Sequence, residues 1–235
     1  SMALGIATAA GSAGQIIGPP VADYLLQSMN WSTVFLIFAG VIMTVLLALP
    51  FMRSETPMAS KVELEESMGA VLRKAFYDPS YSMIFLGFFS CGFQLGFVTA
   101  HFPAFITEVC AAIAPDSVMR SIGINSTTAL GAFSIALIGA ANMVGTIAAG
   151  ALGKYYTKKY LLVAIYVGRT IASAAFILYP MTPTSVVLFS IVMGSLWLAT
   201  VPLTSGLVAH IYGLKYMGTL YGIVFFSHQL GSFLG

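Results

Sequence analysis

Apolar stretches of similar length recur along the chain, separated by short polar joints. A helix needs roughly 20 apolar residues to cross the hydrocarbon core of a bilayer, which is about 30 Å thick. Seven stretches reach that length, at about residues 3–24, 31–52, 81–107, 125–152, 160–179, 184–211 and 216–235. Because most joints have only a few residues, consecutive helices are expected to run antiparallel. The pattern predicts an all-α polytopic membrane protein with about seven transmembrane helices.

One joint, residues 53–80, is long enough to hold structure of its own. Apolar and charged side chains alternate there with helical spacing, which is typical of an amphipathic helix. The apolar positions are Leu64, Met68, Val71, Leu72, Ala75 and Phe76, and the charged ones are Glu63, Glu65, Glu66, Arg73 and Lys74. We expect this helix to lie along the cytoplasmic side and to stop before Asp78-Pro79. A linker between two helix bundles is favoured over a regulatory docking site.

Composition supports a membrane protein. Hydrophobic residues make up 58% and charged residues 8% of the chain, and the mean hydropathy is +0.92. A soluble domain usually carries about 25% charged residues. The net charge of +2 gives no reason to expect nucleic acid as a partner.

Cys91 and Cys110 form no C-x-x-C pair and have no histidine at ligand spacing, so buried thiols are favoured over a metal or redox site.

Basic residues predict the orientation of the helices, because cytoplasmic joints are enriched in Lys and Arg. One set of joints holds Arg53, Lys61, Arg73, Lys74, Lys154, Lys158, Lys159 and Lys215. The alternate set holds only Arg120. We therefore expect the first set, and the N-terminus of the chain, to lie on the cytoplasmic side of a plasma (inner) membrane.

The first stretch carries a glycine pattern. Gly14 and Gly18 form a small-residue face of the kind that lets membrane helices approach closely, and Pro19-Pro20 is expected to bend or end the helix. The spacing Gly5-x8-Gly14-x3-Gly18-Pro19 resembles the fifth-span signature of the major facilitator superfamily (MFS) of secondary transporters, which is associated with antiporters. Where the signature continues with two glycines, this chain has Ala22-Asp23. The run from Trp31 to Phe35 is similar to the opening of that superfamily's sixth span.

Later segments extend the resemblance. Residues 150–159, with Gly150, Lys154, Lys158 and Lys159, are similar to the second copy of the superfamily's cytoplasmic loop motif, although Lys154 stands at its acidic position. Residues 218–231 resemble the eleventh span of bacterial oxalate/formate and monocarboxylate porters. The third stretch, with Gln94 and His101-Phe102-Pro103, resembles their seventh span.

The resemblance implies a fragment of a transporter that covers about spans five to eleven. Residues 1–52 would be the last two helices of an N-terminal bundle, 53–80 a cytoplasmic linker, and 81–235 most of a C-terminal bundle. The expected partners are membrane lipid, a small-molecule substrate, and the missing spans 1–4 and 12 of the same transporter. One incomplete bundle cannot alternate access, so the isolated chain is not expected to transport.

Polar side chains at mid-depth are the candidates for substrate binding, because burial in lipid makes them costly. At 1.5 Å per residue, five of them lie roughly 14–26 Å from one face of the membrane. They are Gln94, Asn142, Arg169, Trp197 and His228, and Gln229 follows directly after the last. The resemblance implies that the spans of Gln94, Trp197 and His228 border the cavity, whereas Asn142 is favoured as a link between helices. We expect His101, nearer the outer face, to serve an interface or outer gate.

Arg169 needs compensation, because arginine at the bilayer centre costs about 2.5–3.5 kcal/mol on insertion scales. No Asp or Glu is expected at that depth. Hydrogen bonds inside the bundle are favoured over a substrate carboxylate as its partner. Without a carboxylate at that level, proton coupling would use His228, or an acidic residue in the missing spans, or would be absent.

The leading hypothesis is a carrier of small, monocarboxylate-like organic anions. A drug or hydrophobic-compound efflux antiporter is the alternative within transport, and a non-transporting seven-helix scaffold or receptor is the alternative in another class. A retinal protein is disfavoured, since Lys215 lies at the mouth of the last stretch and not at mid-membrane. The sequence shows no enzyme motif, and we expect no cofactor and no metal.

Overall fold

The computed structural model describes residues 2–52 and 67–235, and within them it is all helical apart from turns and loops. The helices are α1 (Met2–Leu26), α2 (Trp31–Met43), α3 (Met68–Tyr77), α4 (Pro79–Val109), α5 (Val118–Ser121), α6 (Thr127–Tyr155), α7 (Lys158–Leu178), α8 (Pro183–Leu196), α9 (Thr200–Tyr212) and α10 (Leu214–Leu234). A 3₁₀ segment, Thr44–Met52, continues α2. No strand occurs in the described part of the chain, so the all-α prediction is confirmed.

Four helical segments are long and apolar enough to cross a membrane. They are α4, α6, α7 and the combined α8–α9 segment, Pro183–Tyr212. Helices α1 and α10 have 25 and 21 residues, but glycines, prolines and polar side chains make them less apolar. The described apolar part of the second predicted span, Trp31–Leu47, is shorter than a full span. All seven predicted stretches are nevertheless mainly helical over their described residues, and the stretch 184–211 is divided between α8 and α9.

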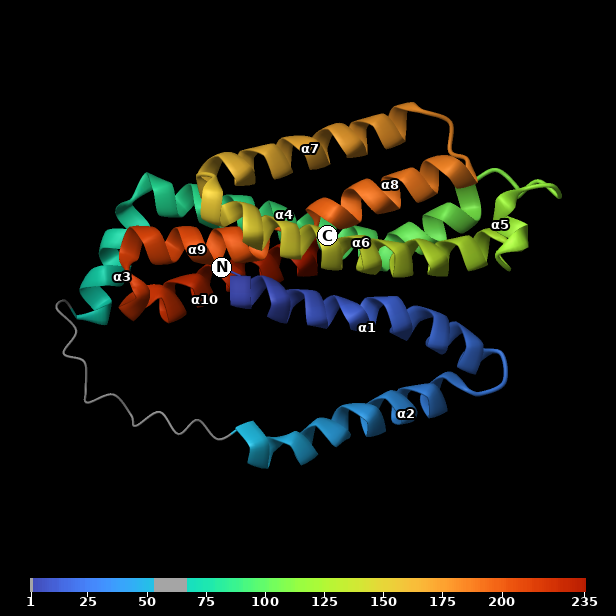
Figure 1. Cartoon of the computed structure of the whole chain (residues 1–235), viewed down its shortest axis with the longest axis horizontal. Helices are drawn as coiled ribbons and strands as arrows, with labels where there is room; N and C mark the ends of the chain where they lie inside the picture. The colour runs from blue at the N-terminus through green and yellow to red at the C-terminus, as the bar shows by residue number, and fades with distance from the viewer. Residues whose placement is uncertain (1, 53–66) are drawn as a thin grey trace.

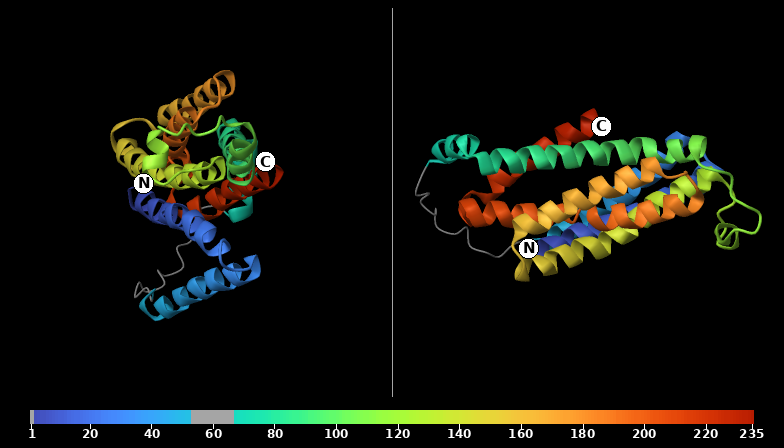
Figure 2. Two further views of the ribbon diagram at one scale, coloured as in Figure 1. Left: turned by 90° about the vertical axis from the view of Figure 1, so that its right-hand side faces the viewer. Right: turned by 90° about the horizontal axis from the view of Figure 1, so that it is seen from above.

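The long helices lie side by side along the long axis of the molecule (Figures 1 and 2). Helix α6 is central and contacts α1, α4, α8 and α9, while α4 pairs with α10 and α7 packs on α8 and α9. The contact between α1 and α6 is the most extensive of all helix pairs, and α2 touches α1 only slightly. Helix α1 therefore packs mainly on the bundle formed by residues 79–235.

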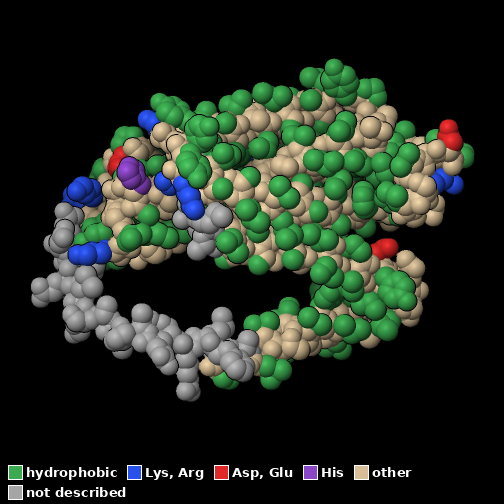
Figure 3. Space-filling view, in the orientation of Figure 1, with side chains coloured by type: hydrophobic (Ala, Val, Ile, Leu, Met, Phe, Trp, Pro, Cys, Tyr) green, Lys and Arg blue, Asp and Glu red, His purple; other side chains and the backbone are tan. Residues whose placement is uncertain are grey.

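Charged side chains gather toward the two ends of the molecule, and the flank between them is mostly hydrophobic (Figure 3). Large apolar side chains along this length are exposed, among them Met83, Val144, Val163 and Phe233. Exposed apolar surface of this extent is typical of a face covered by lipid or by another protein.

Two sequence expectations about helix ends have different outcomes. Helix α1 continues through Pro19 and Pro20 to Leu26, so of the two expected effects of these prolines, bending or ending the helix, the second does not occur. Helix α3 covers the described part of the predicted amphipathic helix and ends at Tyr77, before Asp78-Pro79, as expected. The remaining part of that prediction, with Leu64 and the glutamates at 63, 65 and 66, lies outside the described residues.

Asp78 fixes the start of α4. Its Oδ1 accepts the backbone N–H of Ser80 at 2.8 Å, as an N-cap does. Its Oδ2 accepts the hydroxyl of Tyr212, at the end of α9, at 2.6 Å. The Tyr212 hydroxyl, followed by the Ser80 N–H, lowers the pKa of the Asp78 carboxyl below its ordinary value of 3.8. One carboxylate thus ties the α3–α4 junction to α9.

The predicted stretch 184–211 is interrupted between Leu196 and Thr200, where α8 ends and α9 begins. Trp197 has φ −63° and ψ −81°, outside the helical region. The Thr200 hydroxyl donates to the carbonyl oxygen of Trp197 at 3.4 Å. The sequence predicted one continuous helix over 184–211, whereas the structure divides it at this point. Non-helical backbone is tolerated at membrane depth only where protein or a cavity surrounds it.

Two crossings bring helix backbones into direct contact. A Cβ on Gly92 of α4 would collide with the backbone of His228 on α10, and one on Gly231 would collide with the backbone of Phe89. A Cβ on Gly145 of α6 would meet the backbone of Ser195 on α8. Close approach of this kind is typical of helix association in membranes, where the hydrophobic effect contributes little because lipid tails are as apolar as the side chains.

Candidate functional site

A buried polar cluster lies between α4 and α7, centred on Arg169. Arg169 is 3% exposed, and its Nε donates to Gln94 Oε1 at 2.9 Å. Its Nη1 donates to the sulfur of Cys91, also at 2.9 Å. The amide nitrogen of Gln94 donates in turn to the Ser173 hydroxyl at 2.9 Å. We call these residues, with Thr200 and His228 described next, the Arg169 cluster.

The cluster continues from Cys91 toward α9 and α10. The Cys91 sulfur and the Thr200 hydroxyl are 3.7 Å apart, and the imidazole of His228 lies beside the thiol. His228 is 6% exposed and stacks on Phe225, with ring centroids 5.7 Å apart and planes inclined by 11°. Its Nδ1 is buried and has no hydrogen-bond partner in the described part of the chain. A buried nitrogen without a partner is rare in proteins and calls for an explanation.

The cluster has a net positive character. No Asp or Glu of residues 2–52 and 67–235 forms an ion pair with Arg169, whose Nη2 also makes no hydrogen bond with those residues. The guanidinium lies 6.0 Å from the centre of the Tyr166 ring. Helix α9 begins at Thr200, so the positive end of its dipole adds to the same region. An anion would find both charge and hydrogen-bond donors there.

Asn142 does not belong to this cluster. It is fully buried, and its amide nitrogen donates to Ser12 on α1 at 2.9 Å. Its oxygen accepts the Thr146 hydroxyl at 3.2 Å and the backbone N–H of Leu198 at 2.9 Å. Asn142 therefore joins α1 to α6 and caps the interruption between α8 and α9, and its hydrogen bonds are already used within the protein.

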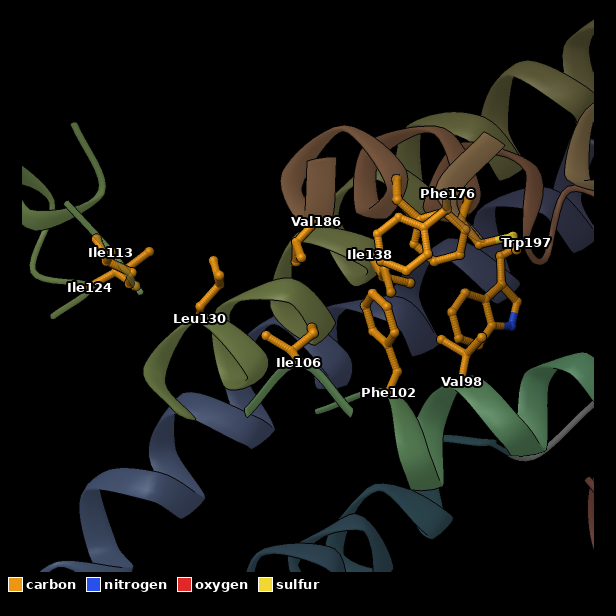
Figure 4. Close-up of a cluster of buried hydrophobic side chains, with 12 residues drawn as sticks. Val98, Phe102, Ile106, Ile113, Ile124, Leu130, Ile138, Phe176, Val186 and Trp197 are labelled. Atoms are coloured by element: carbon orange, nitrogen blue, oxygen red, sulfur yellow. The ribbon is translucent and has the colours of Figure 1, made fainter. Parts of the chain in front are cut away.

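Two other candidates lie in different surroundings. Trp197 is 2% exposed and packs in an apolar cluster with Val98, Phe102 and Phe176 (Figure 4). Its Nε1 is buried and has no partner among the residues described. Gln229 is exposed, although its neighbour His228 on α10 is buried. Of the six candidates, the structure brings Gln94, Arg169 and His228 into one cluster.

Comparison with known proteins decides the family. A model of the Major Facilitator Superfamily matches residues 1–235. The chain belongs to the major facilitator superfamily. No curated protein matches the chain. Members of this superfamily are membrane transporters, so this chain is an integral membrane protein of a transporter family, and the buried polar cluster lies within its helix bundle.

The two MFS-like sequence motifs occupy defined places in the fold. Gly5 of α1 faces Thr146 and Gly150 of α6, so the first residues of the two motifs, Gly5 and Gly150, lie close together. Gly14 and Gly18, by contrast, have open space where a Cβ would be, and no described helix approaches them. Their expected role in close packing is therefore not seen within residues 2–52 and 67–235. Lys154 and Lys159 are exposed at the α6–α7 turn, and Lys158 is half-buried.

Sequence reasoning did not name three members of this MFS chain's polar cluster as site candidates, namely Cys91, Ser173 and Thr200. Cys91 was expected to be an inert buried thiol, and Ser173 was not considered. Both could have been found from helical spacing, because Cys91 precedes Gln94 by three residues and Ser173 follows Arg169 by four. Residues three or four apart share a helix face. Cys110, the other free cysteine, is half-buried and lies away from the cluster.

Proposed function

We propose that the chain is part of a secondary carrier for small organic anions of the monocarboxylate type, and that the Arg169 cluster binds the substrate carboxylate. The observation that carries this proposal is a buried arginine whose hydrogen-bond partners are an amide and a thiol and not a carboxylate. Transporters of this kind bind substrate near the bilayer midplane between two bundles. The positive cluster is suited to an anion at that level.

Each member of the cluster has a part in this proposal. Gln94 holds Nε and orients the guanidinium, which leaves Nη2 for a carboxylate oxygen. The Thr200 hydroxyl and the unpartnered Nδ1 of His228 supply two more polar groups near Cys91. A planar guanidinium suits a carboxylate better than the point charge of a lysine does. Substrate binding would thereby supply a negative charge beside Arg169, whose hydrogen-bond partners are neutral groups.

The proposal is tested by counterflow of radiolabelled lactate and oxalate in proteoliposomes that hold the complete carrier. We expect Arg169→Gln to lower the rate at least tenfold, and Arg169→Lys to restore only a small part of it. Arg120→Gln is the matched control, because Arg120 donates to the carbonyl oxygen of Ile113 outside the bundle. Unchanged counterflow in Arg169→Gln, with normal folding, would contradict the proposal.

Proton coupling is assigned to His228 in the same scheme. His228→Gln keeps a polar side chain but removes the titratable group, so the pH dependence of transport should disappear. A carrier that loses no pH dependence in this variant couples through another group or exchanges substrates without protons.

Efflux of hydrophobic compounds is the second candidate, favoured by the antiporter-like spacing of Gly5, Gly14 and Gly18 in α1. It predicts the opposite results in the same variants. If Arg169 and His228 are dispensable, and the carrier expels a neutral dye but exchanges neither anion, efflux is the function.

A further inference from the structure

A groove of about 480 Å³ runs between α7 and α8, away from the Arg169 cluster. It is lined by Ala172, Ala175, Phe176, Leu188, Phe189 and Val192 along its length, and by Tyr179, Thr182, Thr184 and Ser185 near the joint between the helices. Phe176 and Phe189 stack at its base, with ring centroids 4.3 Å apart. The volume is within the range of about 300–1,000 Å³ typical of small-ligand sites.

The polarity of the groove changes along its length. The part between the helix bodies is apolar, whereas hydroxyl groups gather where α7 ends and α8 begins. Thr182 and Ser185 bond to each other in the N-cap of α8, but the hydroxyls of Tyr179 and Thr184 make no hydrogen bond with described residues. No Lys, Arg, Asp or Glu lines the groove. An occupant should therefore be long, apolar and uncharged overall, with a polar end.

The location of the groove indicates where such an occupant comes from. Helix α7 and the α8–α9 segment are both apolar enough to span a membrane. Ala175, Leu188 and Val192 are exposed, so the groove opens to the side of the bundle and not to its ends. The hydroxyl end lies at the end of α7 farthest from Lys158 and Lys159, where the helix leaves the bilayer. The molecules that bathe this face in a membrane are lipids.

We propose that this groove is a binding site for one acyl chain of a zwitterionic phospholipid. The chain lies against Phe176 and Phe189, and the Tyr179 and Thr184 hydroxyls hydrogen-bond to the ester or phosphate oxygens. Tyrosine is enriched at this level of membrane proteins because its ring is apolar and its hydroxyl is polar. The absence of a basic lining residue favours a zwitterionic headgroup over an anionic one.

Tryptophan fluorescence provides the test, because bromine on a lipid chain quenches a nearby indole. The chain has two tryptophans, and Trp197 belongs to the same apolar cluster as Phe176 and Phe189 (Figure 4). In a Trp31→Phe background, brominated phosphatidylcholine should quench Trp197 although that residue is 2% exposed. Ala175→Phe and Val192→Phe, which fill the groove from either helix, should each reduce the quenching at least twofold.

The matched control is Ala174→Phe, which adds the same ring at an exposed position of α7 outside the groove lining. It should leave the quenching unchanged, and circular dichroism confirms that each variant is folded. Quenching that survives both filling variants would overturn the proposal, as would quenching that depends on protein concentration, which indicates a second copy on this face. Stronger quenching by brominated phosphatidylglycerol than by phosphatidylcholine would overturn the assignment of a zwitterionic headgroup.

Discussion

At the scale of single residues, the described structure compensates a buried cation without a carboxylate. Arg169 is held by Gln94 and Cys91, and hydrogen bonds to a charged group contribute about 1.5–3 kcal/mol each. These bonds offset part of the cost of an arginine in lipid. Both bonds lie inside the bundle, and Nη2 of Arg169 makes no hydrogen bond with the described residues.

Asn142 gives the clearest stability prediction. Asn142→Leu removes the acceptor of the Leu198 N–H and leaves that group buried at the α8–α9 interruption. An unsatisfied buried donor costs about 1–3 kcal/mol, so thermal unfolding in detergent should occur several degrees lower. Asn125→Leu is the control, because Asn125 is exposed and bonds only to the nearby carbonyl oxygen of Gly123. Equal stability of the two variants would contradict this role for Asn142.

Asp78 predicts an acid-dependent loss of stability. Its carboxyl has a lower pKa in the folded protein than in the unfolded chain. The stabilisation is therefore complete above the unfolded value of about 3.9 and is lost as the pH falls through the folded pKa. Tyr212→Phe removes the largest cause, so its unfolding temperature should fall less between pH 6 and pH 2 than that of the parent, a difference that differential scanning fluorimetry measures. Identical pH profiles would show that the Tyr212 hydroxyl contributes nothing.

The sequence does not determine which way each polar side chain points within the bundle. Depth along each helix placed five polar candidates near one level, but depth says nothing about the direction in which a side chain points. Gln229 and His228 are adjacent, yet one is exposed and the other buried. Asn142 and Arg169 are at similar predicted depth but have different partners. The rotation of each helix about its axis, set by packing, separates these cases.

At the scale of helices, glycines determine which pairs come into contact. The α4–α10 crossing excludes a side chain at Gly92 and Gly231, and Ser227 on α10 donates to the carbonyl oxygen of Phe85 on α4 at 3.0 Å. The sequence shows glycines in several predicted helices. Their spacing alone predicted a close-packing face at Gly14 and Gly18. In the structure those two positions are open. A glycine pattern predicts that close packing is possible, not which helix provides it.

A pair of alanine substitutions on α10 tests this with opposite expected signs. Gly231→Ala puts a methyl group into the backbone of Phe89 and should destabilise the protein by about 1–3 kcal/mol. Gly222→Ala adds a methyl group at a position where no other atom lies within 4 Å of the new Cβ. It should stabilise the protein by roughly 0.5–1 kcal/mol, because alanine has a higher helix propensity than glycine. Unfolding in detergent, followed by circular dichroism, measures both. A stabilising effect at both positions would show that the crossing is looser than described.

Helix boundaries followed the sequence closely where caps were visible. Asp78-Pro79 and Thr182-Pro183 mark the starts of α4 and α8, each with a side-chain cap and an early proline. The prolines at 19 and 20 do not end α1, because a proline inside a helix is tolerated in membrane segments where neighbours satisfy the freed groups. The interruption at Trp197 depends on Asn142, which lies 56 residues away from Leu198 in sequence and could not be paired with it beforehand.

At the scale of the molecule, α1 joins the bundle of residues 79–235, while α2 contacts α1 slightly. The fold class and the family followed from apolar length and motifs, because both depend on local sequence. The assignment of residues 1–52 to a separate N-terminal bundle stays a prediction. In the proposed mechanism that bundle rocks against the other around the substrate.

The proposal predicts that residues 1–235 alone do not transport. Proteoliposomes with this polypeptide should show no counterflow of lactate above protein-free liposomes, whereas the complete carrier does. Substrate binding to the Arg169 cluster should be weak, since the facing bundle contributes nothing. Saturable uptake by this polypeptide alone would contradict the two-bundle mechanism.

The glycine crossing of α4 and α10 has a consequence for how the carrier tolerates change. Where two main chains touch, there is no room for a side chain. Glycine is therefore the one residue that fits at Gly92, Gly96, Gly231 and Gly235. The lipid-facing positions one turn away accept almost any oily residue. Random mutagenesis of this protein should therefore lose nearly all variants at these four positions, but few of the apolar replacements at lipid-facing positions of α4 and α10.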